Sequence, residues 1–244
     1  MKKCLIFAAV CTVLFASCKF EINDGLRIEP SSKIVKNEYK LSAFDQLEVN
    51  AIANVKFIQG SEGDYRVVLS CPDNYVMLFK FEVEKDGELE IGFVHNNTNI
   101  EATNVDVTVY APQLRKLDNS GVASVEAERL KGDRLKVENS GVGSVYLYGL
   151  QIDDIEVDCS GVGSMELGGK ADRATLECSG VGGITADKLQ AKTVKADVSG
   201  VGGIKCYASE RIEGNVSGVG SLTFDGKPQE KKLNRSGVGN ITEL

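Results

Sequence analysis

Residues 140–143 read Ser-Gly-Val-Gly, and this phrase decides the fold because it returns at a nearly constant spacing. Six copies are complete, and a further copy begins at Ser120 as Ser-Gly-Val-Ala. Successive copies begin 20, 20, 19, 20, 18 and 19 residues apart. Such a period indicates a repeat architecture, in which each unit buries its apolar face only by stacking on its neighbours. The residues that we assign to the repeated turn are Ser120, Gly121, Ser140, Gly141, Gly143, Ser160, Gly161, Gly163, Ser179, Gly180, Gly182, Ser199, Gly200, Gly202, Ser217, Gly218, Gly220, Ser236, Gly237 and Gly239.

The residues around each phrase alternate between apolar and polar. With the phrase serine as position 0, positions −3 and +5 are mostly aliphatic, and position −2 is acidic in five consecutive copies. Alternation with a period of two is typical of β-strands, whose side chains point to opposite faces in turn. Stacked units would pair each strand in parallel with its equivalent about 4.8 Å away. We therefore predict an all-β fold, a single-stranded parallel β-helix with about 20 residues per coil.

We interpret the phrase itself as a corner of each coil. Glycine adopts positive φ without steric cost, so it suits a sharp turn. We expect the valine at position +2 to point into the core, and the serine to bond turn backbone or to align with serines of neighbouring coils. Gly161→Val is then predicted to be far more damaging than Gly149→Val, because Gly149 lies outside the phrase.

Residues 38–116 depart from the period. Residues 50–57 follow the same pattern with small residues in place of glycine, and we interpret them as a degenerate copy. Short apolar runs follow, and the Asp-Gly pair at residues 86–87 separates two of them like a hairpin turn. Terminal units of a solenoid are commonly atypical because they cap the stack. We predict one β-helix domain over residues 38–244, with irregular coils and a cap over 38–116 and seven regular repeats over 117–244.

The N-terminus has the pattern of a lipoprotein signal peptide over residues 1–17. A basic start precedes an apolar run that is short for a membrane span, and Ala16 and Ser17 are small residues typical of a cleavage site. Cys18 follows directly, so we predict lipidation of Cys18 and a tether over residues 18–37. Several acyl chains on one cysteine hold a protein stably on a membrane. The alternative is an ordinary signal peptide with a chance cysteine. The expected location is the cell envelope, as an outer-membrane lipoprotein that faces the surface or the periplasm.

Composition argues against several classes of function. The formal charge of −7 disfavours nucleic acid as a partner, because phosphate binding needs basic patches. The single histidine, His95, cannot form a multi-histidine metal site. It also lies in the irregular half, away from the phrase serines, which therefore lack the base that a nucleophile needs. We predict no catalytic residue, no cofactor and no resident metal.

The cysteines at position −1 are interpreted as core residues. Cys159 and Cys178 hold this position in adjacent copies, so we expect them to be stacked and to face inward. Stacked side chains of parallel strands point the same way, whereas a disulfide needs a specific dihedral angle. Buried free thiols are therefore the simpler interpretation.

The acidic residues at position −2 are the sharpest chemical feature of the sequence. In-register stacking would place them about 5 Å apart along one face. Such a column could bind Ca²⁺, which prefers several oxygen ligands. The simpler interpretation is a solvated face, because Lys116, Lys136 and Lys195 at position −4 neutralise part of the charge. The candidate cation column is Asp118, Glu138, Asp158, Glu177 and Asp197.

Together with the leader over residues 44–60, the repeats resemble the DUF2807 family, described as a "putative auto-transporter adhesin, head GIN domain". The resemblance covers about residues 38–244. It implies a right-handed parallel β-helix with pectin-lyase-like architecture, of the kind found in lipoproteins and secreted proteins of Bacteroidota. The family brings no established catalytic set, so no site residue is carried over from it.

We therefore predict a non-enzymatic, lipid-anchored protein of the cell envelope, an adhesin-like β-helical module that binds a glycan or a protein at the cell surface. Tyr146 and Tyr148 are candidates for stacking on sugars. One alternative is a polysaccharide lyase or hydrolase, which fold analogy alone suggests. Another is a purely structural envelope protein. A recognition surface is expected beside the corners, on the outward columns or within residues 58–116.

Overall fold

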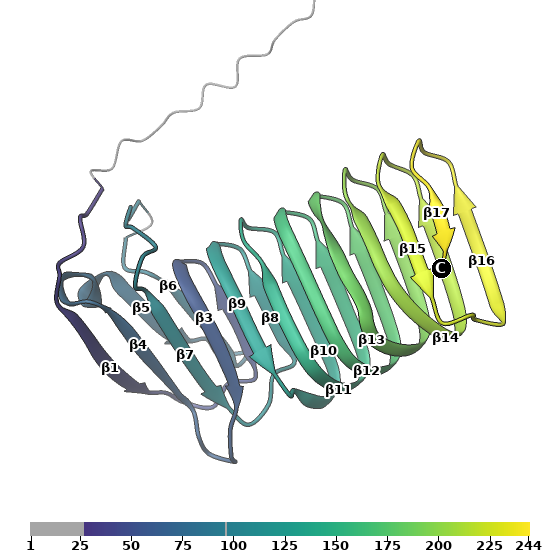
Figure 1. Cartoon of the computed structure of the whole chain (residues 1–244). Helices are drawn as coiled ribbons and strands as arrows, with labels where there is room; N and C mark the ends of the chain where they lie inside the picture. The colour runs from purple at the N-terminus through teal and green to yellow at the C-terminus, as the bar shows by residue number, and fades with distance from the viewer. Residues whose placement is uncertain (1–26, 96) are drawn as a thin grey trace, which may run out of the picture.

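The computed structural model describes residues 27–95 and 97–244, and these residues are almost entirely β-structure (Figure 1). Seventeen strands join in one continuous sheet that winds into stacked coils. The one helical element of these residues is the 3-10 helix η1 (Asp73–Leu78), and no helix among them is long and apolar enough to cross a membrane. The predicted all-β parallel β-helix is confirmed. The predicted signal peptide and the predicted lipid site, Cys18, lie outside the described residues.

The repeats form the regular half of the solenoid, in which each coil pairs in parallel with the next. Val137 lies between Leu117 and Val157, and all three residues occupy position −3 of their repeats. Equivalent positions therefore stack from coil to coil. The strands are β8 (Lys116–Asn119), β9 (Val122–Glu128), β10 (Lys131–Asn139), β11 (Val145–Cys159), β12 (Val162–Cys178), β13 (Val181–Val198), β14 (Gly203–Val216), β15 (Ser221–Asp225), β16 (Glu230–Arg235) and β17 (Ile241–Glu243).

The apolar core fills the inside of the coils. Burial alternates along each strand, so that Leu117 at position −3 and Val125 at position +5 are fully buried. Strands β11 to β14 contain 14 to 18 residues because each continues through a second corner, where the pairing register shifts. Each of these coils thus has a first corner at the repeated phrase and a second corner within its long strand.

The N-terminal half stacks in an order that differs from the order of the sequence. The degenerate copy forms a coil, with β2 (Gln46–Val49) between β6 (Glu88–Phe93) and β8. Likewise β3 (Ile52–Gln59) lies between β7 (Asp106–Ala111) and β9. The chain leaves this coil, builds the end of the solenoid, and returns as β6 and β7 on the outer side. It then passes beyond the β2–β3 coil to start the regular half.

Antiparallel strands and aromatic side chains cover the N-terminal end. Strand β4 (Arg66–Pro72) pairs antiparallel with β1 (Ile34–Lys40) and with β7. Strand β5 (Phe79–Val83) forms a hairpin with β6, and Gly87 in its turn has a φ of +83°, which confirms the predicted turn. Phe57 and Tyr75 are buried at this end, so the first coils do not expose their core to solvent.

Charged side chains close the C-terminal end. Lys231 takes an inward position in β16, opposite the buried Ile212 of β14. Glu243 takes an inward position in β17, opposite the buried Phe224 of β15. The Lys231 ammonium group lies 2.7 Å from a carboxylate oxygen of Glu243. The last coil therefore places an ion pair over the core, beside the inward and 42% exposed Leu233.

Candidate functional site

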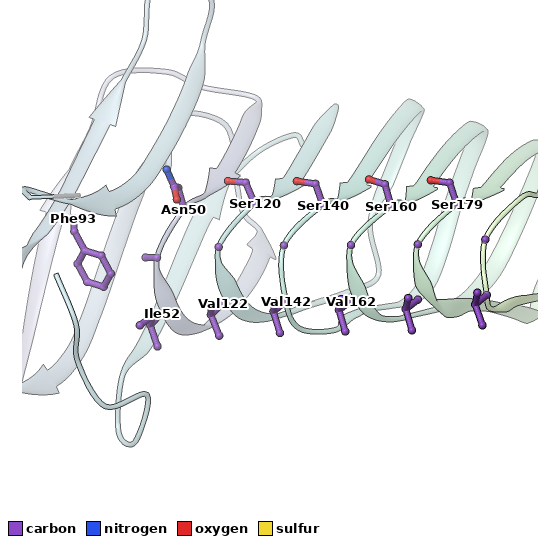
Figure 2. A pocket seen from close by; sticks show the side chains of 18 of the residues that line it. Asn50, Ile52, Phe93, Ser120, Val122, Ser140, Val142, Ser160, Val162 and Ser179 are labelled. Carbon is purple, nitrogen blue, oxygen red and sulfur yellow. The ribbon is translucent and has the colours of Figure 1, made fainter. Parts of the chain in front are cut away.

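A groove runs along the first corner of the coils, where the repeated phrases stack (Figure 2). Outward serines form one wall, outward valines form the other, and the glycines lie between them. Phe93 of β6 stands at one end. The groove has a volume of about 700 Å³ and crosses six coils, from Ile52 to Val201, a length of about 24 Å. We call it the Ser-Val groove; its repeat walls are Ser120, Ser140, Ser160 and Ser179 opposite Val122, Val142, Val162, Val181 and Val201.

The valines of the phrase point outward, so the expectation that they face the core is wrong. Their exposed fraction is 51% at Val122 and rises to 84% at Val238. The reason is that the period of two continues through the corner. Positions −1, +1, +3 and +5 face inward, and positions 0 and +2 face outward. The valines therefore form an apolar ridge on the surface, and contiguous exposed apolar rows mark interaction sites.

The glycines are required because neighbouring coils approach each other closely at this corner. A Cβ atom on Gly161 would lie 2.6 Å from the carbonyl carbon of Ser140 and would overlap the carbonyl oxygen of Gly141. Gly161 does not have a positive φ, so the predicted reason for this glycine is replaced by a different one. An inward side chain at position +1 has no space between the two main chains.

The main chain of the first corner is engaged in hydrogen bonds from coil to coil. The N–H group of Val142 donates to the carbonyl oxygen of Gly121 at 2.9 Å, and the N–H of Val162 donates to that of Gly141 at 3.0 Å. The serine hydroxyls stand along the groove wall instead (Figure 2). Ser120 Oγ lies 3.3 Å from Glu48 Oε1. The groove thus offers hydroxyl and methyl groups to a ligand, and little unpaired backbone.

The side chains at position −1 stabilise the first corner from the inside through hydrogen bonds. The Asn139 amide donates to the carbonyl oxygen of Gly143, four residues ahead, at 3.2 Å. The thiols of Cys159 and Cys178 make the equivalent contact to position +3 at 3.8 Å. Sequence reasoning placed these residues inward but missed this role. The available signal was a polar Asn at a position that the in-out alternation places inside the coil.

The predicted acidic column is in register and extends further than the repeats indicate. Asp118 pairs with Glu138 on one side and with Glu48 on the other, and Glu48 pairs in turn with Glu90. Within residues 27–95 and 97–244, the column does not bring three carboxylates within 4.8 Å of one another. Cation binding by Asp118, Glu138, Asp158, Glu177 and Asp197 stays a prediction.

Lysines neutralise part of the acidic column. Lys136 Nζ lies 3.0 Å from Glu138 Oε1, and Lys116 Nζ lies 3.9 Å from Asp118 Oδ2. Burial, and then the charge of Glu138, raise the pKa of Asp118 above its ordinary value of 3.8. Burial, and then Glu88, raise the pKa of Glu48. Asp118 and Glu48 therefore resist ionisation where neighbouring carboxylates crowd them.

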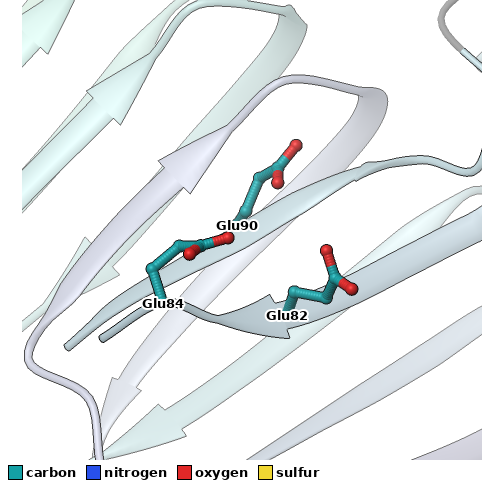
Figure 3. Close-up of side chains that lie close together, drawn as sticks. All are labelled: Glu82, Glu84 and Glu90. Atoms are coloured by element: carbon teal, nitrogen blue, oxygen red, sulfur yellow. The ribbon is translucent and has the colours of Figure 1, made fainter. Parts of the chain in front are cut away.

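A second acidic group lies on the cap hairpin, where Glu82, Glu84 and Glu90 approach within 4.8 Å (Figure 3). Lys80 Nζ lies 2.7 Å from Glu90 Oε2 and 3.2 Å from Glu82 Oε2. Lys80 thus balances two of the three carboxylates. Sequence reasoning did not single out this group, although the alternating Glu residues on both sides of a hairpin turn were a signal for it.

The cysteines of the described residues are buried free thiols, as expected for Cys159 and Cys178. These two are direct register partners in β11 and β12. The neighbouring Cys178 thiol, and then burial, raise the pKa of Cys159. Burial raises the pKa of Cys71 to about 11 and that of Cys206 to about 12. Since the thiolate is the reactive form, Cys71 and Cys206 act as small core residues at neutral pH.

The tyrosines proposed to stack on sugars are half-buried. The Tyr148 hydroxyl donates to Glu166 Oε2 at 2.7 Å. This hydrogen bond, and then burial, raise the pKa of Tyr148 to about 12. Tyr148 therefore ties one coil to the next, and Tyr146 lies beside it on β11, outside the Ser-Val groove.

The family profile described as "Putative auto-transporter adhesin, head GIN domain" matches residues 43–228 of the chain. The chain belongs to this DUF2807 family. The match begins at the leader and includes strands β2 to β15, both corners of the long coils and the whole Ser-Val groove. The predicted membership of the DUF2807 family is confirmed.

Solved structures share the fold of this DUF2807 protein. A "putative adhesin" from Bacteroides fragilis NCTC 9343 is 33% identical, with a TM-score of 0.85 over 89% of this chain and 100% of that chain. A "putative lipid binding protein" from Parabacteroides distasonis ATCC 8503 is 23% identical, with a TM-score of 0.70 over 89% and 99%. A "putative adhesin" from Parabacteroides merdae ATCC 43184 is 19% identical, with a TM-score of 0.66 over 89% and 99%. The last two show the fold alone. Comparison with curated proteins gives no match.

The DUF2807 family description and the Bacteroides fragilis structure support an adhesin-like role for the chain, at the cell surface or in the envelope. Both name an adhesin rather than an enzyme. The Ser-Val groove is the surface that fits this role best, because it is long, periodic and formed by the repeated phrase itself.

Proposed function

We propose that the chain is a non-enzymatic, lipid-anchored adhesin module of the cell envelope that binds an extended glycan along the Ser-Val groove. The observation that carries the proposal is the pair of parallel rows, serine hydroxyls and exposed valines, on the two walls of one groove (Figure 2). A sugar ring presents apolar C–H faces and hydroxyl groups side by side. The two rows match these two kinds of surface.

The state of the backbone favours a glycan over a peptide strand. A peptide that adds to a sheet needs unpaired N–H and C=O groups along an edge. At the first corner these groups are engaged between coils, as in the bond from Val142 N–H to Gly121 O. The serine hydroxyl and valine methyl groups of the groove remain available, and they suit a ligand that is bound through its own hydroxyl and C–H groups. A protein ligand bound through its side chains is the second outcome that the test below distinguishes.

The position of the described N-terminus supports an anchor at the capped end. Arg27 forms an ion pair with Glu101 at 2.9 Å, and Ile28 bridges to Ile100. Both contacts lie in the N-terminal half of the solenoid. Lipid on Cys18, nine residues before Arg27, would therefore hold the capped end toward the membrane. The Ser-Val groove would then extend away from the bilayer.

The test is a glycan microarray probed with the domain from Arg27 onward, followed by titration of the glycan that binds best. Val162→Asp places a charge in the middle of the groove. Val238→Asp makes the same change at the same phrase position, but Val238 lies outside the groove. We expect Val162→Asp to weaken binding at least tenfold, about 1.4 kcal/mol. We expect Val238→Asp to bind as the unmodified domain does.

Three results would contradict the proposal. Equal loss in both variants would show that the groove is not the site. An array without any bound glycan would favour a protein ligand or a structural role. Release of reducing ends from a bound polysaccharide would favour the lyase or hydrolase alternative. Metabolic labelling with an alkyne fatty acid, compared between the full chain and Cys18→Ser, tests the anchor separately.

A further inference from the structure

A second groove lies at the second corner, on a different part of each coil. It has a volume of about 1120 Å³ and is lined by parts of β11, β12, β13 and β14. Lys170, Lys188 and Lys192 line it, together with Gln151 and Gln190. Nothing in the adhesin proposal uses this groove.

One outward column of the second corner alternates lysine and glutamine in strict register. Lys131 of β10 pairs with Gln151, Gln151 pairs with Lys170, and Lys170 pairs with Gln190. Gln190 pairs in turn with Tyr207 of β14. The residues that follow them in each strand, such as Ile152 and Ala171, are buried, so the column faces outward. We call these five residues the Lys-Gln column.

The five members of the Lys-Gln column include no acidic residue, although acidic residues outnumber basic ones by seven in the chain. Asp153 and Asp172 line the groove beside the column, and Asp225 of β15 pairs with Tyr207 at its end. Lys192, nearby in the groove, is paired with Asp172 at 2.7 Å. Within residues 27–95 and 97–244, no carboxylate lies within 4.0 Å of the ammonium group of Lys131, Lys170 or Lys188. The charge of these lysines is therefore available to a ligand.

The first member of the column is held in place by a side chain from another coil. The Lys131 N–H group donates to Gln59 Oε1 at 2.8 Å, and Gln59 Nε2 donates to the Lys131 carbonyl oxygen at 3.0 Å. Gln59 Nε2 also donates to the carbonyl oxygen of Pro112 at 2.8 Å. The other members lie within long strands that pair on both sides. The spacing of the column is therefore fixed before a ligand arrives, which reduces the cost of ordering on binding.

We infer that the Lys-Gln column binds an extended anionic polysaccharide that carries one acidic group on every second sugar. Lysines two coils apart are separated by about 10 Å. A chain running along the column would place one sugar near each coil. Its acidic groups would then meet Lys131 and Lys170, and the sugars between them would meet the amides of Gln151 and Gln190.

The uncharged members of the column select a glycan over other polyanions. A glutamine amide donates and accepts hydrogen bonds at once, which suits sugar hydroxyl and acetamido groups. Tyr207 at the end of the column offers an aromatic ring with a hydroxyl tip. A site for phosphate alone would gain nothing from amides at every second coil.

The experiment uses hyaluronan oligosaccharides, in which every second sugar carries a carboxylate, and the domain from Arg27 onward. Carboxyl-reduced hyaluronan and single-stranded DNA are the comparison ligands. Binding is measured by calorimetry at low and high salt. The variant is Lys131→Gln/Lys170→Gln, and the matched control is Lys205→Gln/Lys227→Gln, which removes two exposed lysines outside the column.

We expect hyaluronan to bind the unmodified domain. We expect its affinity to be about tenfold weaker for the column variant and unchanged for the control variant. We expect salt to weaken this binding, because exposed charges are screened. The proposal is overturned if carboxyl-reduced hyaluronan or DNA binds as tightly as hyaluronan. It is also overturned if both double variants lose the same affinity, or if hyaluronan does not bind the unmodified domain. Val162→Asp, which changes the Ser-Val groove, should leave hyaluronan binding unchanged, so the two proposals fail independently.

Discussion

The Asn119 amide donates to the side-chain oxygen of Asn139 in the adjacent coil, at 2.9 Å, and both side chains are fully buried at position −1. The same amide donates to the carbonyl oxygen of Ala123 at 3.2 Å. Asn119 thus bonds both its own corner and the next coil, and Asn139 bonds its own corner through the carbonyl oxygen of Gly143. The bond between these amides therefore joins the first two regular coils beneath the Ser-Val groove.

Replacing Asn139 by valine should destabilise the protein by about 1–3 kcal/mol, because the Asn119 amide and the Gly143 carbonyl oxygen lose a buried partner. Valine fits this position, since Val198 and Val216 hold it in later coils. The double variant Asn119→Val/Asn139→Val should therefore lose less than the sum of the single losses. Urea unfolding of the four proteins gives the coupling energy. Strictly additive losses would show that the side-chain bond contributes nothing.

Gly161→Val should lower the melting temperature far more than Gly149→Val. At Gly161 a Cβ atom collides with the main chain of the neighbouring coil. At Gly149 the nearest atoms would be Arg129 Cγ at 3.2 Å and Arg129 N at 3.4 Å, which is a much milder contact, and the cost is chiefly the positive φ of +66°. A non-glycine residue in that region costs about 1–2 kcal/mol. Calorimetric scans of both variants compare them, and equal melting temperatures would contradict the close-approach explanation.

The sequence predicts the coil, its period and the parallel stacking, because the repeat places the same residue at the same step of every coil. The alternation of inward and outward positions could also have predicted that the valines of the phrase face outward. Val122 at position +2 has the same parity as Asp118 at −2, so both face outward. The expectation of an inward valine assumed that a corner interrupts the alternation. In the structure the glycines let the alternation pass through the corner unbroken.

The order of stacking in the N-terminal half could not be read from the repeat. Residues 46–59 match the pattern, yet their neighbours in the stack are residues 88–111 and 116–128. Non-local pairing of this kind leaves no local signal. The Lys-Gln column was hidden for a similar reason. Register shifts at the second corner, such as that between Glu166 and Gly168, mean that equal sequence spacing does not identify stacked residues there.

Asp118→Asn should stabilise the protein more near pH 7 than near pH 3. Burial and Glu138 raise the pKa of Asp118 in the folded state, so the folded protein binds this proton more tightly than the unfolded chain does. The ionised form therefore costs stability above the raised pKa, and this cost disappears as pH falls below the ordinary value of 3.8. Melting temperatures of variant and unmodified protein at both pH values give the difference.

Asp154→Asn is the control of opposite sign. A hydrogen bond from Arg173 lowers the pKa of Asp154, so its ionised form stabilises the folded state. This contribution is present above the ordinary pKa and is lost as pH falls through the lowered value. Asp154→Asn should therefore be less stable than the unmodified protein near pH 7, and this difference should be smaller near pH 3. The same sign for both variants would contradict the assignment of their environments.

Replacing Lys231 and Glu243 together by leucine should make the domain associate through its C-terminal end. The two charges form an ion pair over the core, and within residues 27–95 and 97–244 strands β16 and β17 pair on one side only. Inward charges are one way in which proteins protect such an edge. Light scattering after size exclusion should show dimers or larger species for the double variant. A matched exchange on the side of the solenoid, Lys192→Leu/Asp172→Leu, should leave the mass of the unmodified domain unchanged.

The interleaved stacking of the N-terminal half divides the molecule into a part of fixed design and a part of adjustable length. The β2–β3 coil is locked between two later segments, so no unit there can be lost without breaking its neighbours. Each coil of the regular half contacts only the coil before and the coil after it. Gain or loss of one whole coil would lengthen or shorten the Ser-Val groove by about 4.8 Å. The regular half is in this sense a molecular ruler, and related chains could match ligands of different length by changing the number of coils alone.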